Sequence, residues 1–226
     1  MTVHRSASLA RNSASSFPRA RALVLFKGTG SIDKALEAIG FQVQSLDIDP
    51  KCNATWTTDI MDRNCPLEPG SIDYIWASPL CTEYSRALTT RPRKMELADR
   101  LVKRTLEIIE RLQPQYWTLE NPGSGELKNR EFMKGLPYKD VCYCRYGYPY
   151  LKWTRLWGNA PFVPRPMCTR KNPCEQSASG RHPTVAQRST SRGRPDISYS
   201  INQLYSIPPS LCRDIVVSVA DGLSGL

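Results

Sequence analysis

Two short stretches of the sequence carry side chains that could act together on a substrate. "SPLCTEYS" (78–85) presents Cys81 two residues after a proline, and "YWTLENP" (116–122) contains Glu120. A cysteine thiolate is a strong nucleophile, and a carboxylic acid beside it can protonate the group under attack. On a pyrimidine, the thiolate would add to C6 while the acid stabilises a proton on N3. The alternative for Cys81 is a small buried hydrophobic residue, the usual role of a free cysteine.

The segments around these two stretches read as alternating strands and helices. "SIDYIWA" (71–77) and "YWTLE" (116–120) have the composition of strands, and residues 94–112 carry apolar side chains at helical spacing. Such alternation predicts an α/β fold with a doubly wound, mainly parallel, Rossmann-like sheet. Because the carboxyl ends of parallel strands share one edge, we expect Cys81 and Glu120 to face one cleft.

An N-terminal strand, turn and helix precede them and are typical of a cofactor site. "ALVLF" (22–26) leads into "KGTGS" and a helix ending near Gly40, and a second strand ends at Asp47, 19 residues after Gly28. Gly28 and Gly30 let backbone amides approach a ligand, and an acid at this spacing can bind ribose hydroxyls. Position 33 is aspartate rather than a third glycine, so S-adenosylmethionine fits at least as well as NAD. The alternative is an ordinary helix entry with a surface acid.

The order of these blocks resembles the cytosine-C5 methyltransferases. That family's catalytic loop reads Pro-Pro-Cys-Gln-x-Phe-Ser, and its acid lies in Glu-Asn-Val. This chain has "PLCTEYS" and "ENP" in the same order, preceded by "LFKGTGS", "SLDIDP" and "TTDI" and followed by "YGYPYLKWT" and "YSIPPSL". The resemblance covers about residues 23–222. It implies methylation of cytosine C5 in DNA, with RNA as the less favoured substrate and the target base flipped out of its stack.

The resemblance also implies a role for individual residues. Cys81 would attack cytosine C6, and Glu120 would act at N3. Residues contacting S-adenosylmethionine would be Phe26, Gly28, Gly30, Asp47, Asp59 and Pro79, with Pro79 also shaping the catalytic loop. Residues contacting the substrate would be Ser85, Asn121 and Lys152.

The chain departs from the family pattern at several positions, which leaves two other functions open. Leu80 and Thr82 replace a proline and the glutamine of the catalytic loop, and Lys152 alone keeps a positive charge where the family has Gln-x-Arg-x-Arg. One alternative is a cytosine-N4 amino methyltransferase, because "SPL" resembles the loop of those enzymes. The other is a catalytically inactive homologue that binds nucleic acid.

Charge and composition favour a polyanionic partner. The chain has 226 residues and a formal net charge of +10, and residues 165–194 carry seven basic side chains against the single acid Glu175. This stretch could follow DNA phosphates, or it could be a solvated loop. No apolar run approaches the roughly 18 residues of a membrane span, so we expect an intracellular protein of the nucleus or cytoplasm with no membrane partner. We also expect it to be monomeric.

Four segments follow from this pattern. Residues 1–21, with four arginines and no acid, are predicted to be a disordered basic tail, although an organellar import signal has a similar composition. Residues 22–160 form the predicted catalytic core that binds S-adenosylmethionine. Residues 161–200 form a small, irregular, basic insertion that contacts the target, and residues 201–226 pack back on the core through a last helix over about 210–221.

The eight cysteines do not form a recognisable metal motif. Cys168, Cys174 and His182, with Cys142 and Cys144 upstream, lack a paired Cys-x-x-Cys. We therefore predict no metal ligand from the sequence, with a structural zinc site as the alternative.

Overall fold

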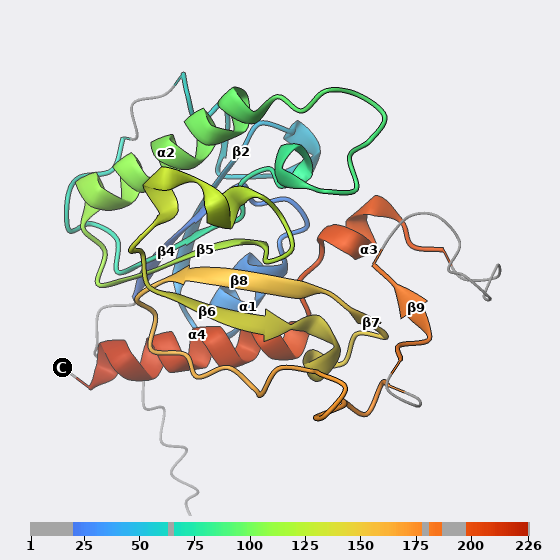
Figure 1. Ribbon diagram of the computed structural model, residues 1–226. Helices are drawn as coiled ribbons and strands as arrows, with labels where there is room; N and C mark the ends of the chain where they lie inside the picture. The colour runs from blue at the N-terminus through green and yellow to red at the C-terminus, as the bar shows by residue number, and fades with distance from the viewer. Residues whose placement is uncertain (1–19, 63–65, 178–180, 187–197, 226) are drawn as a thin grey trace, which may run out of the picture.

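The computed structural model describes residues 20–62, 66–177, 181–186 and 198–225, and a seven-stranded sheet lies at its centre (Figure 1). The strand order is β3-β2-β1-β4-β5-β8-β6. The strands are β1 (Arg21–Leu25), β2 (Gln42–Asp47), β3 (Trp56–Thr57), β4 (Tyr74–Ala77), β5 (Tyr116–Pro122), β6 (Tyr138–Cys142) and β8 (Trp153–Gly158). The pairs from β3 to β5 are parallel, and β8 runs antiparallel to both neighbours. This order confirms the predicted doubly wound, mainly parallel sheet.

Helices cover both faces of this sheet. The described α-helices are α1 (Ser31–Ala38), α2 (Met95–Leu112), α3 (Ile201–Tyr205) and α4 (Pro209–Ser224), of which α3 buries no residue. In Figure 1, α2 lies on one side of the sheet, and α1 and α4 lie on the other. Along β1, Ala22 and Val24 pack in the cluster that contains α1 and α4, whereas Leu23 and Leu25 pack in the cluster that contains α2. The alternation of a strand thus fills both cores.

The two long helices agree with the sequence pattern. Helix α2 begins at Met95 and ends at Leu112, within one residue of the predicted helix over 94–112. Helix α4 begins at Pro209, and the first turn tolerates a proline because an N–H group there would have no partner within the helix. The helix buries Leu211 and Ile215 beside α1. None of the described helices combines the length and apolar character that a membrane span needs.

The last two sheet strands lie where the sequence shows no clear pattern. Strands β6 and β8 occupy the aromatic stretch after Tyr138, and β8 inserts between β5 and β6. A basic residue, Arg155, interrupts the apolar residues of β8, so its composition does not mark a strand. Gly158 is required at its end, because φ is 138° there and an added Cβ would come within 2.0 Å of the Trp117 carbonyl oxygen.

A second, two-stranded sheet joins a distant segment to this region. Strands β7 (Tyr150–Leu151) and β9 (Thr184–Val185) are parallel, with Tyr150 opposite Thr184.

At the other end of the chain, β1 begins at Arg21, the last residue of the predicted basic tail. Residues 1–19 of that tail lie outside the described residues.

Candidate active site

The catalytic loop leaves β4 at the carboxyl edge of the sheet and is held there by buried contacts. Cys81 precedes the short 3-10 helix η2 (Thr82–Tyr84). The Asn121 side chain, at the end of β5 and 1% exposed, donates a hydrogen bond of 3.0 Å from Nδ2 to the Pro79 carbonyl oxygen. The buried Tyr84 hydroxyl donates to Asp99 Oδ1 at 2.9 Å, which ties the loop to α2. The loop is therefore fixed to both neighbouring elements.

Cys81 lies close enough to Glu120 for the carboxylate to influence its ionisation. Cys81 follows β4 and Glu120 lies in β5, and these adjacent parallel strands pair Ala77 with Leu119. Burial raises the pKa of the Cys81 thiol, the Glu120 carboxylate raises it further, and the Lys152 ammonium group lowers it. The structure thus brings together the two side chains that the sequence singled out for chemistry.

Glu120 is a buried carboxyl group with a perturbed acidity. Burial raises its pKa, whereas Lys152, the Tyr143 hydroxyl and the Ser78 hydroxyl lower it in part. The Tyr143 hydroxyl donates to Glu120 Oε1 at 3.2 Å. A carboxyl group with a raised pKa keeps its proton at a higher pH and can deliver it to a substrate.

Lys152 lies at the catalytic pair. Its Nζ donates to the Leu204 carbonyl oxygen at 2.8 Å and sits 4.6 Å from the centre of the Tyr143 ring. Its charge favours the ionised forms of both Cys81 and Glu120. Lys152, one of the predicted substrate contacts, therefore places a positive charge near Cys81 and Glu120.

The glycine turn after β1 has a constrained backbone. Phe26 has a φ of 60°, a left-handed conformation that is rare for a bulky residue and is found most often at functional sites. Gly28 and Gly30 follow with φ of 52° and 67°. The Gly28 amide donates to Asp47 Oδ2 at 2.9 Å, so the turn is tied to the end of β2. An added Cβ at Gly28 would meet only the Phe26 carbonyl oxygen, at 3.8 Å, which leaves the turn open to a ligand.

The other acid predicted at the cofactor site lies in the turn after β3. Asp59 Oδ1 accepts a hydrogen bond from the Met61 amide at 2.9 Å. Directly after Asp47, the Ile48 side chain is 66% exposed. This exposed apolar group was not singled out from the sequence, although its position at the carboxyl end of β2 makes it available to a flat ligand ring.

Two residues of the catalytic loop have local structural contacts. Ser85, a predicted substrate contact, accepts a hydrogen bond from the Ala87 amide through Oγ at 3.2 Å. Glu83 is only 3% exposed and pairs with Arg91 at 2.5 Å, and it also accepts from the Lys94 amide at 2.7 Å. These donors lower the pKa of Glu83 to about 2. Glu83 thus closes the loop over 83–94 onto the start of α2.

Tyr143 is another side chain at this site that was not singled out from the sequence. The aromatic stretch from Tyr143 to Trp157 reads as core and turn residues, and Tyr143 is indeed fully buried. Its hydroxyl nevertheless contacts Glu120. The tyrosine hydroxyl is the feature that could have indicated this contact, because a buried tyrosine hydroxyl usually has a hydrogen-bond partner.

Comparison with known proteins places these motifs in context. The chain is 30% identical over 218 residues to a protein of Frog virus 3 (isolate Goorha) described as a probable DNA (cytosine-5)-methyltransferase. The alignment covers 87% of this chain and 98% of the viral protein. No protein-family model matches the chain.

Two solved structures are more distant. One is a prophage-encoded E. coli protein described as a DNA modification methyltransferase, with 19% identity, a TM-score of 0.48, and coverage of 66% of this chain and 51% of that one. The other is the Dnmt2 methyltransferase of S. pombe, with 18% identity, a TM-score of 0.44, and coverage of 62% and 50%. The chain thus spans about half the length of these two proteins.

Proposed function

Since the chain belongs to the DNA (cytosine-5)-methyltransferase family, we propose that it methylates C5 of cytosine in DNA with S-adenosylmethionine as the methyl donor. The observation that carries this proposal is the Cys81 thiol beside Glu120, a buried carboxyl group with a raised pKa. Neither amino-group methylation nor simple binding requires this pair.

The two side chains supply complementary halves of one activation step. As a thiolate, Cys81 adds to C6 of the cytosine, and the new S–C6 bond displaces the electrons of the C5–C6 double bond into the ring. Protonated Glu120 gives its proton to N3, which takes up the charge that this addition creates. C5 thereby becomes nucleophilic. After methylation, a water molecule takes the C5 proton, the electrons of that C–H bond re-form the C5–C6 double bond, and the S–C6 bond breaks to release the Cys81 thiolate. N3 then returns its proton to Glu120.

Lys152 and Tyr143 influence the protonation states of this pair, and both favour the ionised form of Glu120 against the effect of its burial. In the free protein the raised pKa of Cys81 favours the thiol, and the Lys152 ammonium group favours its ionisation. A protonated Glu120 also removes the negative charge beside the thiolate. The hydrogen bond from Tyr143 orients the Glu120 carboxyl group. Both residues therefore act on the pair that forms and breaks bonds.

The residues around the glycine turn suit the proposed methyl donor. Asp47 offers a carboxylate to ribose hydroxyls, the Phe26–Gly30 turn gives close access to backbone groups, and exposed Ile48 offers an apolar contact to adenine. Asp59 and Pro79 complete the proposed set. S-adenosylmethionine, when bound, would supply the electrophilic methyl group that C5 takes up.

The basic residues beyond β8 are proposed to contact DNA. Among the described residues of this segment, the basic side chains are Arg165, Arg170, Lys171 and Arg181. They could bind phosphates and release counterions, which predicts DNA binding that weakens as salt increases. The target cytosine must leave the base stack, because a thiolate cannot reach C6 within a duplex.

The position of the transferred methyl group tests this proposal. The purified chain, DNA and S-adenosylmethionine are incubated, and the nucleosides are separated by mass spectrometry against standards of 5-methylcytosine and N4-methylcytosine. We expect 5-methylcytosine from the wild type and none from Cys81→Ser. A product methylated at N4, or salt-sensitive DNA binding without any product, would contradict it.

A further inference from the structure

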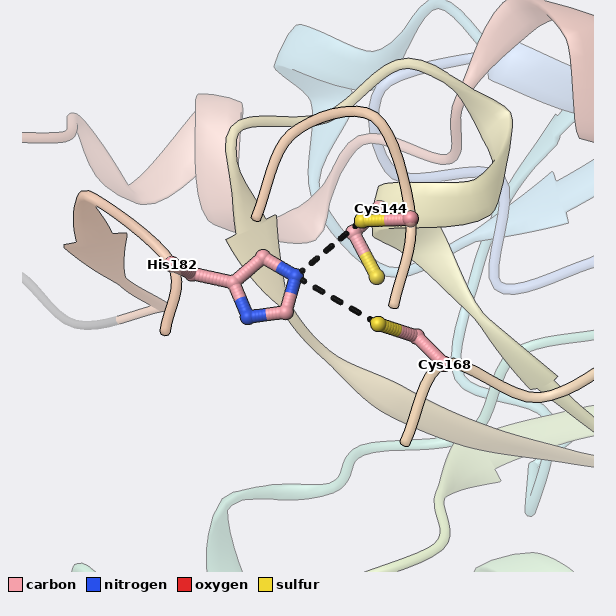
Figure 2. Close-up of side chains that lie close together, drawn as sticks. Cys144, Cys168 and His182 are labelled. Carbon is pink, nitrogen blue, oxygen red and sulfur yellow. Dashed lines mark hydrogen bonds between the residues drawn. The ribbon is translucent and has the colours of Figure 1, made fainter. Parts of the chain in front are cut away.

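Three cysteines and one histidine, distinct from the Cys81–Glu120 pair, converge in the structure. Cys144 lies on the short helix η5 (Tyr143–Tyr146), Cys168 and Cys174 lie in the stretch after β8, and His182 lies two residues before β9. One ligand atom from each side chain lies within 4.8 Å of all the others. Figure 2 shows the labelled side chains of Cys144, Cys168 and His182 pointing toward one another from separate segments. We propose that these four residues bind a structural zinc ion.

The separations of the ligand atoms match a tetrahedral zinc centre. With Zn–S bonds of about 2.3 Å and Zn–N bonds of about 2.0–2.1 Å, sulfur and nitrogen ligands of one zinc ion lie about 3.6 Å apart. His182 Nε2 lies 3.8 Å from Cys168 Sγ and 3.3 Å from Cys174 Sγ. These two distances fall on either side of the expected value, so one nitrogen already faces two sulfurs at coordinating separations.

The chemistry of the donors selects zinc and a structural role. Three thiolates and one imidazole are soft or borderline ligands, which disfavours Mg²⁺ and Ca²⁺. All three sulfurs belong to free cysteines. Four protein ligands also fill a tetrahedral shell and leave no position for a water molecule, as catalytic zinc requires.

The surroundings have the protection expected of such a site. Cys144 and Cys174 are buried. Cys142, one residue before Tyr143, lies against Met167 with 3.6 Å between the sulfurs, and both pack in one cluster with Cys144, Cys168 and Cys174. This sulfur-rich, apolar shell would limit access of water to the metal.

The proposed ion would fasten the basic segment to the catalytic core. Within the described part of residues 161–186, backbone pairing to the core comes from β9 through β7. The Arg145 guanidinium adds side-chain bonds, donating to the Asn172 carbonyl oxygen at 2.6 Å. Cys144, the proposed ligand from the core, directly follows Tyr143, which contacts Glu120. The ion would thus hold the proposed DNA-binding segment at a fixed place beside the cleft.

This site differs from the sequence-based prediction of no metal ligand. Five residues separate Cys168 from Cys174, and seven separate Cys174 from His182, so no short paired motif exists. The fourth ligand, Cys144, comes from the core, on the far side of β7 and β8 in the sequence. Only folding brings it to the other three.

Metal content is the direct test. The full chain is purified without a metal-affinity tag or chelator under reducing conditions, and its zinc is measured by plasma mass spectrometry. We expect about one zinc ion per chain in the wild type and in Cys52→Ser, whose thiol lies outside the cluster. Cys174→Ser and His182→Ala should each lose most of it.

A measurement on the folded wild type covers the case in which the variants fail to fold. A mercurial reagent that blocks thiols should release zinc to a coloured indicator, and replacement by Co²⁺ should give the strong visible absorption of a tetrahedral thiolate site. The proposal is overturned if the wild type holds no stoichiometric zinc and gives no such Co²⁺ spectrum. Zinc content unchanged in both variants, or a disulfide between two of these cysteines in the reduced preparation, would also overturn it.

Discussion

The proposed catalytic pair, Cys81 and Glu120, and the cysteine–histidine cluster both join distant segments, but different forces hold them. Cys81 and Glu120 are placed by two parallel strands, β4 and β5, whose backbone register continues up to Ala77 and Leu119. Cys168 and Cys174 lie outside the strands and helices, so their place depends on side-chain contacts and, in our proposal, on a metal. Removal of the Cys81 or Glu120 side chain should therefore affect the chemical step, whereas removal of a side chain from the cluster should affect the structure.

The largest expected effect is a loss of chemistry without a loss of fold. Cys81→Ala should lower the rate of methylation by roughly three orders of magnitude or more, because no other group supplies the nucleophile. The denaturation midpoint and the affinity for S-adenosylmethionine should stay close to those of the wild type. A rate within tenfold of the wild type, measured with radiolabelled methyl donor, would remove Cys81 from the mechanism.

Loss of the acid should have the next largest effect. Glu120→Gln should slow methylation by about 10²–10³-fold, since a positioned acid typically contributes at this level. The raised pKa of Glu120 means that the active, protonated form is present at low pH and is lost as pH rises through that pKa. The Cys81 thiolate, which the step also needs, forms as pH rises through the raised pKa of Cys81. The wild-type rate should therefore follow both titrations, whereas the Gln variant should show only the rise that accompanies ionisation of Cys81.

Tyr143→Phe sharpens the same experiment. Without the tyrosine hydroxyl, which stabilises the carboxylate, the pKa of Glu120 should rise further, and the part of the pH–rate profile that Glu120 governs should move to higher pH. The rate at the pH optimum should change by less than about tenfold. An unchanged pH profile would show that this hydrogen bond does not set the acidity of Glu120.

The opposite behaviour is expected in the cluster. Cys174→Ser should lower thermal stability and weaken DNA binding by roughly fivefold, because the basic segment loses its attachment to the core. At saturating DNA, the chemical step should be retained, since Cys81 and Glu120 are placed by the sheet. Single-turnover kinetics and fluorescence anisotropy separate the two effects, and a selective loss of the chemical step would break the distinction between the two regions.

The smallest effect is expected at Glu83, where a side-chain contact supports the cleft itself. Its pKa is lowered from 4.5 to about 2, so its contribution to stability is present above pH of about 4.5 and is lost as pH falls toward 2. Glu83→Gln should be slightly less stable than the wild type at neutral pH, and the difference should shrink on acidification. Urea unfolding across this range measures it, and a constant difference would assign the effect to packing alone.

The sequence predicted the parts that depend on strand and helix patterns. The doubly wound sheet and helix α2 follow from local periodicity, and the proximity of Cys81 and Glu120 follows from parallel strand topology. Strand β8 was missed because Arg155 interrupts its apolar residues, and that arginine is accommodated by pairing with Asp140 at 2.8 Å. Such a partner is visible only after folding.

Contacts between distant side chains could not be read from the sequence. The Tyr143–Glu120 hydrogen bond spans 23 residues, and the burial of Glu83 depends on Arg91 closing the loop back on it. Cys144 and Cys168 lie close together in space although strands β7 and β8 separate them in the sequence. No local spacing encodes these contacts, because tertiary packing creates them.

Covalent trapping on modified DNA is the most direct test of the proposed chemistry. The protein is incubated with S-adenosylmethionine and DNA containing 5-fluorocytosine, whose fluorine cannot leave as the C5 proton does, so the S–C6 bond should persist. We predict a denaturant-stable protein–DNA adduct that peptide mapping places on Cys81. Absence of an adduct from folded protein that binds both S-adenosylmethionine and DNA would contradict methylation of C5 through Cys81.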